Sequence, residues 1–174
     1  MIRIEIATFD TLDYIARHLR EQDRIELAAT SATDSPVEWL ADKVMAHALM
    51  AFVARNERVP ISAWGMVPLW PGVGAAFAFG TDDWGQALWP MTKHVRGFMM
   101  RFLLDNGYHR IECRALATRK DVGRWVTLFG AEQEAVLRSS GKRGEDFILY
   151  RWLRERRPAD ESAARNPPPI GDRR

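Results

Sequence analysis

The fold is decided by residues 107–150, which read GYHRIECRALATRKDVGRWVTLFGAEQEAVLRSSGKRGEDFILY. Apolar periodicity and glycine-rich breaks divide this stretch into four elements. They are a strand over 110–116, a short helix over 120–129 that stops at Gly130, and strands over 134–138 and 146–153. A strand, a helix and two further strands in this order predict an α/β domain.

The residues before this stretch also alternate between the two kinds of element. Ile2, Ile4 and Ile6 alternate with polar residues and predict a half-buried strand. Two helices follow; their apolar faces are Leu12, Ile15, Ala16, Leu19 and Ile25 in the first, and Val37, Leu40, Ala41, Val44 and Met45 in the second. Strands are then expected over 51–55, 61–67 and 75–79, and a long helix from Pro90 to the Asn106-Gly107 stop.

Composition limits what kind of protein this is. A chain of 174 residues fits one domain over 1–153, followed by an Arg- and Pro-rich tail over 154–174 that we expect to be flexible. The net charge of +2 does not favour nucleic-acid binding. The N-terminus has no signal-peptide pattern and no stretch is apolar enough to span a bilayer, so we expect a soluble protein with no membrane partner.

The residues that commonly bind metals are sparse. Cys113 is the only cysteine, which excludes an intrachain disulfide and a cysteine-based zinc cluster, and its strand position favours a core thiol over a nucleophile. His94 and His109 have no carboxylate at metal-ligand spacing. We therefore expect no metal site.

The order of elements and the 107–150 segment resemble the GNAT (Gcn5-related N-acetyltransferase) superfamily. In GNAT proteins a strand like Arg110–Arg114 precedes a short helix that ends in a Leu-Gly-Phe turn, and Phe129-Gly130-Ala131 stands in that place here. A basic strand and a final strand, here DFILY over 146–150, then close the sheet. The resemblance covers roughly residues 1–153. It implies a central mixed sheet flanked by helices, with acetyl-CoA as the possible cofactor.

A narrower resemblance rests on fewer residues. The segment Phe79–Trp84, with Trp89 and a basic helix after it, is similar to the small GNAT-like internal virion proteins of short-tailed phages. This resemblance implies a bacteriophage virion component. Its partners would be other virion proteins, and its location would be the host-cell cytoplasm or the interior of the particle.

The cofactor loop of the superfamily is altered in this chain. GNAT enzymes hold the CoA pyrophosphate on backbone N–H groups at the start of the long helix, in a loop of the form Arg/Gln-x-x-Gly-x-Gly/Ala. The corresponding residues, 84–91, read WGQALWPM and keep only Gly85. Lys93 and Arg96 follow and are candidate phosphate-binding residues; the alternative is that they form the solvated face of an amphipathic helix. The acetyl-CoA site is expected to be degenerate.

The catalytic positions also depart from the superfamily. The resemblance places the general-acid tyrosine at Val126 and a helix-opening asparagine at Arg119. Asp82, Asp83 and Glu112 are the carboxylates available as a general base, with Asp83 and Glu112 as the predicted catalytic residues. The alternatives are an exposed turn or helix-capping pair at Asp82-Asp83, and a Glu112 that faces solvent or pairs with Arg114.

Three tryptophans near Pro and Gly turns form a candidate docking patch. Trp70, Trp84 and Trp89 lie close in sequence to the expected cofactor mouth, and tryptophan is frequent in contact surfaces. The alternative is local packing between strand and helix.

Two functional hypotheses follow. The first is a non-catalytic GNAT-fold phage component that acts through protein–protein contacts. The second is an active acetyl-CoA-dependent N-acetyltransferase with a small-molecule amine substrate. A third class, nucleic-acid binding, is not supported by the near-neutral charge.

Overall fold

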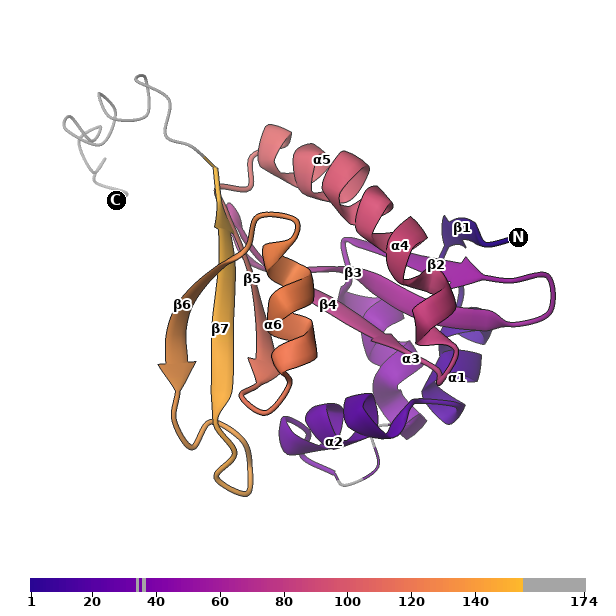
Figure 1. Cartoon of the computed structure of the whole chain (residues 1–174), viewed down its shortest axis with the longest axis horizontal. Coiled ribbons are helices and arrows are strands. Elements are labelled where there is room, and N and C mark those ends of the chain that lie inside the picture. Colours follow the sequence, from indigo (N-terminus) through magenta and orange to yellow (C-terminus); the bar gives the residue numbers. More distant parts are fainter. Residues whose placement is uncertain (34, 36, 155–174) are drawn as a thin grey trace, which may run out of the picture.

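The computed structural model describes residues 1–33, 35 and 37–154, which form a seven-stranded sheet with helices on both faces (Figure 1). The strands are β1 (Arg3–Ile6), β2 (Met50–Arg55), β3 (Pro60–Trp70), β4 (Val73–Gly80), β5 (Arg110–Leu116), β6 (Glu132–Leu137) and β7 (Phe147–Leu153). The helices are α1 (Phe9–Arg17), α2 (Glu21–Ala29), α3 (Val37–His47), α4 (Trp84–His94), α5 (Met100–Asp105) and α6 (Lys120–Thr127). A π-helical turn, η1 (Val95–Met99), joins α4 to α5.

The described residues do not cover every predicted segment. Apart from Arg154, the predicted tail over 154–174 lies outside them. Within them, no helix has the length and apolar character that crossing a membrane requires.

The sheet has the order β1-β2-β3-β4-β5-β7-β6. Neighbouring strands run antiparallel, except β4 and β5, which run parallel and are joined by the α4–η1–α5 crossover. These two strands pair only where Val73–Ala75 lies beside Arg110–Glu112. Beyond Ala75 and Glu112 they diverge, and this divergence positions the candidate site.

Each face of the sheet has its own core. Helices α4, α5 and α6 cover one face, and α1 and α3 cover the other (Figure 1). Because successive side chains of a strand point to opposite faces, Ala76 and Ala78 of β4 pack with the first core, whereas Phe77 and Phe79 pack with the second. The residues of β4 therefore reach both cores.

The predicted order of elements is confirmed, with one helix added near the N-terminus. The first predicted helix is two helices, α1 and α2, and Ile25 is exposed on α2 rather than buried with Leu12. The break occurs at Arg20, whose backbone N–H donates to the carbonyl of Gly80 at 2.9 Å. This long-range bond turns the chain, so the apolar periodicity of α1 does not continue.

The long helix begins six residues earlier than Pro90 predicts. It starts at Trp84, and Pro90 lies inside it. A proline at this position leaves the carbonyl of Gln86 without its helical N–H donor. Gln86 is exposed, so water can reach this carbonyl, and the helix continues through the proline.

Replacing Gly65 with alanine should destabilise the sheet. The added methyl group would collide with the backbone carbonyl of Met50 and lie 2.7 Å from the ring of Phe77, and overpacking of this kind costs about 1–3 kcal/mol. Gly85→Ala is the matched control: its methyl group meets no described atom within 4 Å, so removing a helical glycine should stabilise by about 0.5–1 kcal/mol. Urea unfolding measures both; a Gly65→Ala protein as stable as wild type would contradict this packing.

Candidate functional site

A slot opens where β4 and β5 diverge. Its volume is about 470 Å³. Ala76 and Ala78 line it from the face covered by α4 and α6, and Phe77 and Phe79 line it from the opposite face. The slot is therefore lined from both faces of the sheet.

Most of the slot wall is apolar, and the charged lining residues form two groups. The apolar wall comes mainly from the α4–α5 and α6 side and includes Trp64, Met99, Met100, Val126, Phe129 and Trp152. Arg20, Asp23, Glu26 and Arg119 lie around α2, whereas Glu112 and Arg114 lie on β5 and pair with each other. The slot therefore combines a hydrophobic interior with two separate groups of charged residues.

Helix α2 bridges the separated ends of the two strands. Asp23 accepts a hydrogen bond of 2.8 Å from the backbone N–H of Gly80, the last residue of β4. Glu26, one helical turn later, accepts a bond of 3.3 Å from the backbone N–H of Leu116, the last residue of β5. Asp23 and Glu26, three residues apart on α2, thus accept backbone N–H groups from the last residues of β4 and β5, which do not pair with each other there.

Two arginines complete this bridge. Arg119, which is buried at the start of α6, donates to Asp23 at 3.1 Å and also binds Asp121 through two nitrogens. Arg20 binds Asp23 at 2.7 Å. Because Asp23 is itself buried, these contacts provide the partners that a buried carboxylate requires.

Glu26 is the least compensated carboxylate of this group. Its Oε2 atom lies 3.5 Å from the Arg119 guanidinium. Burial raises the pKa of Glu26 to about 7, against the lowering effects of Arg119 and of the Leu116 N–H, while Asp23 and Asp121 raise it further. A carboxyl with this pKa changes its charge near neutral pH, which is the property of a general acid or base.

Two tryptophans connect α4 to α6 beside the slot. The rings of Trp84 and Trp125 meet edge to face, with centroids 5.7 Å apart. The indole N–H of Trp125 donates to the Thr92 hydroxyl at 2.7 Å, and the Arg20 guanidinium lies 4.1 Å from the Trp84 ring centroid. These contacts fill the space between the two helices with side chains.

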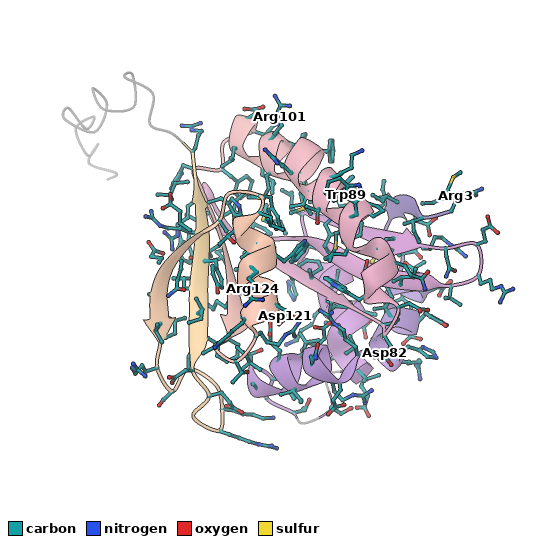
Figure 2. The ribbon with its side chains drawn as sticks, viewed as in Figure 1. Arg3, Asp82, Trp89, Arg101, Asp121 and Arg124 are labelled. Atoms are coloured by element: carbon teal, nitrogen blue, oxygen red, sulfur yellow. The ribbon has the colours of Figure 1, made fainter. Side chains whose placement is uncertain are left out.

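The turn before α4 is held by hydrogen bonds of its own backbone. The resemblance to GNAT enzymes requires free backbone N–H groups here, but those of Asp83, Trp84 and Gln86 already donate to Thr81 or Asp83 at 2.9–3.3 Å. Asp82 and Asp83 are exposed at the same turn, where their carboxylates would repel a phosphate (Figure 2). Three backbone N–H groups at the start of α4 are therefore already bonded within the turn.

The two predicted carboxylates lie in different places. Glu112 is buried in β5, lines the slot and pairs with Arg110 at 3.0 Å and Arg114 at 3.6 Å. Asp83 is exposed and accepts a bond from the Gln86 side chain, outside the slot lining. The structure does not bring the two together.

The predicted cofactor-binding residues lie on the outer surface. Gly85, Lys93 and Arg96 are all exposed, and none belongs to the slot lining. Their predicted contact with phosphate stays a prediction.

The three predicted docking tryptophans are not one cluster. Trp70 pairs with Val73 at the start of β4, whereas Trp84 follows the opposite end of that strand. Trp84 is half-buried, and Trp89 is 70% exposed on α4 (Figure 2). Of the three, Trp89 is the one both exposed and near the start of the crossover.

Asp23 and Glu26 were not predicted as site residues from the sequence, and Arg119 was predicted only as the residue in place of a helix-opening asparagine. A signal was available, because Asp23, Glu26 and Leu27 follow Leu19 at helical spacing, so two carboxylates occupy positions expected to be apolar.

The Cys113 side chain packs against the first core, as expected of a core thiol, and burial raises its pKa to about 12. Within the described residues no group of His, Cys, Asp and Glu could hold a metal ion.

Asp23→Ala should strongly destabilise the protein. It leaves Arg119 and the Gly80 N–H without their buried acceptor, and breaking a buried ion pair costs about 3–5 kcal/mol. Asp13→Ala is the control, because its pair with Arg17 lies on the surface, and we expect no measurable change. Thermal unfolding followed by circular dichroism compares them; equal midpoints would show that α2 does not hold the strands.

Glu26→Gln should change how stability depends on pH. The pKa of Glu26 is raised in the folded state, so the contribution of this group to stability is largest while it is protonated and is lost as pH rises through about 7. The amide cannot ionise, so the variant should gain about 2–3 kcal/mol over wild type at pH 8 and nothing at pH 4. Urea unfolding at both values measures the difference; an equal gain at both would contradict the shifted pKa.

Among known proteins, the chain is similar to solved structures. No protein-family model and no curated protein sequence matches the chain. The ribosomal-protein-alanine N-acetyltransferase of Brucella melitensis superposes with a TM-score of 0.65 at 15% identity, over 87% of this chain and 99% of that one. The corresponding S18-alanine enzyme of Escherichia coli gives 0.62 at 14%, over 88% and 94%.

A third structure was solved with AcCoA. The phosphinothricin acetyltransferase of Sinorhizobium meliloti superposes with a TM-score of 0.66 at 11% identity, over 87% of this chain and 88% of that one. At these identities the superpositions establish architecture and not activity. The chain therefore has the GNAT acyltransferase fold, a mixed sheet opened between β4 and β5 and flanked by helices.

Proposed function

We propose that this GNAT-fold protein does not transfer acetyl groups and acts instead by binding other proteins. The observation that carries the proposal is the turn before α4, where the N–H groups of Asp83, Trp84 and Gln86 are already bonded and two exposed aspartates would repel phosphate. Val126 supports it as well, because this slot residue has no proton to donate where the resemblance places a tyrosine.

Exposed aromatic side chains on the crossover support the role in protein contacts. Trp89, Phe98 and Phe102 are exposed there, and the Phe98 and Phe102 rings stack with centroids 5.8 Å apart. Lys93 and Arg96 are exposed on the same crossover. Exposed aromatic side chains together with arginine are typical of protein interfaces.

The class of partner follows from the narrower sequence resemblance. The similarity of Phe79–Trp84 and Trp89 to internal virion proteins of short-tailed phages supports other virion proteins as partners. On this proposal the protein works in the host cytoplasm or inside the phage particle.

Isothermal titration with acetyl-CoA tests the loss of cofactor binding. We expect no saturable heat up to millimolar acetyl-CoA, because the phosphates find no free donors. A Lys93→Ala, Arg96→Ala double variant is the control for phosphate contacts on the outer surface. Micromolar binding that the double variant abolishes would overturn the proposal and assign both residues to the cofactor.

An active N-acetyltransferase is the second candidate function. It is favoured by the slot lined from both faces and by Glu26, whose pKa of about 7 suits a base that takes a proton from a small amine. The same titration separates the candidates, since an acetyltransferase must bind acetyl-CoA.

A further inference from the structure

Strand β1 forms one edge of the sheet and has an open side. It comes first in the strand order and, within residues 1–33, 35 and 37–154, it pairs with β2 alone (Figure 1). An open strand edge presents backbone N–H and C=O groups that can pair with a strand of another chain. The sheet can therefore be extended at β1.

The backbone of β1 fixes which residues face the open side. The N–H of Ala7 donates to the carbonyl of Ala51 at 2.9 Å and continues the register of β1 with β2. The hydrogen-bonding groups of successive residues point to alternate sides of a strand. Those of Ile2, Ile4 and Ile6 therefore point away from β2, towards the open side.

The side chains of β1 form an apolar face and a charged face. Ile2 and Ile4 pack against the first core, and the alternation of the strand puts Ile6, which is 76% exposed, on the same face. Arg3 and Glu5 lie on the other face of the sheet. Arg3 is exposed at the outer edge of the molecule, and none of the described carboxylates pairs with it (Figure 2).

The sequence of β1 is complementary to itself in one antiparallel register. With Ile4 opposite Ile4 of a second copy, Ile2 lies opposite Ile6 and Arg3 lies opposite Glu5, and two-fold symmetry repeats both pairs. A shift of two residues in either direction places Arg3 opposite Arg3 or Glu5 opposite Glu5. Like charges directly opposite each other destabilise a strand pair, whereas opposite charges stabilise it. Charge therefore selects the register centred on Ile4.

A shift of one residue fails for another reason. It places isoleucines opposite charged residues, whose backbone groups point towards β2 and not towards the open side. Backbone geometry and charge therefore favour the same register.

We propose that two copies of this chain join their sheets through an antiparallel pair of β1 strands, with a two-fold axis at Ile4. The outward backbone groups of the three isoleucines bond to those of the second copy, and the Ile2–Ile6 contacts cover the exposed Ile6. Two Arg3–Glu5 ion pairs form on the opposite face. Glu5 contacts Arg55 through Oε1 at 3.5 Å, which leaves Oε2 for the second copy.

The apolar surface at Ile6 continues onto the crossover. Phe52 lies opposite Ile6 in the β1–β2 register, and its ring meets that of Phe98 with centroids 5.9 Å apart. Phe98 is itself 47% exposed. The strand edge thus adjoins a larger apolar surface, a feature that marks interaction sites. The inference goes beyond the proposed function, because it requires neither acetyl-CoA nor a different protein.

Sedimentation velocity of the full chain over a range of concentrations tests the dimer. A pair of short strands is a small interface, so we expect a reversible association, with monomer at about 1 μM and mainly dimer at about 300 μM. A monomer over the whole range would overturn the inference.

Charge reversal tests the register. Arg3→Glu and Glu5→Arg should each weaken dimerisation at least about tenfold, because each places like charges opposite one another. An equimolar mixture of the two variants should form the dimer again, since an acidic strand then meets a basic one. Arg124→Glu is the matched control: this exposed arginine lies on α6, and its reversal changes the net charge as Arg3→Glu does (Figure 2). It should leave the dimer unchanged.

Amide hydrogen exchange of the wild-type chain is a measurement that needs no variant. The N–H groups of Ile4 and Ile6 should exchange more slowly at high protein concentration, whereas that of Ala7, which bonds to β2, should be protected equally at low and high concentration. Exchange at Ile4 and Ile6 that does not depend on concentration, or a dimer that both single variants leave intact, would contradict the proposed pairing. None of these outcomes bears on acetyl-CoA binding.

Discussion

The structure depends on how α2 holds the free ends of β4 and β5. Parallel strands that stop pairing after three positions leave backbone N–H groups without acceptors, and buried groups of this kind are destabilising. Asp23 and Glu26 accept two of them, at Gly80 and Leu116, the last residues of the two strands. Because the acceptors lie one turn apart on one helix, α2 also sets the distance between the strand ends.

The same interaction explains the electrostatics of the slot. A carboxylate buried between two strand ends needs a cation, and Arg119 supplies it from the start of α6. Arg119 is shared by Asp23, Glu26 and Asp121, so its charge cannot neutralise all three. Glu26, which lies farthest from it among the three, keeps a raised pKa. The structural support of the slot and its chemistry are therefore properties of one cluster.

The turn that follows Gly80, next to the α2 bridge, is held by its own hydrogen bonds. Where GNAT enzymes offer free N–H groups to a pyrophosphate, this turn closes on itself through Thr81 and Asp83. Trp84 and Trp125 then join α4 to α6 through their rings and the Thr92 hydroxyl. Packed side chains therefore occupy the space between α4 and α6 beside this turn, in an architecture that hosts many functions.

The sequence by itself determined the order of elements, because the periods of strands and helices are local properties. The stretch over 107–150 predicted β5, α6, β6 and β7 to within a few residues, and the poor match of residues 84–91 to a phosphate loop was also readable locally. The break between α1 and α2 could not be predicted locally, because it depends on a hydrogen bond from the backbone N–H of Arg20 to the carbonyl of Gly80, sixty residues away. The start of α4 could not be predicted locally either. Pro90 is a local signal for a helix start, but the turn at Thr81 begins the helix at Trp84 instead.

Only the tertiary structure decided the site. The helical spacing of Asp23 and Glu26 is a local signal, but their partners are not. The buried pair of Asp23 with Arg119 and the bonds to Gly80 and Leu116 follow from the divergence of β4 and β5. Glu112 was found from the sequence because it lies in a recognisable strand, but its partner in the prediction, Asp83, lies outside the slot. Burial and long-range pairing set the charge and pKa of a carboxylate, and neither property is encoded in local periodicity.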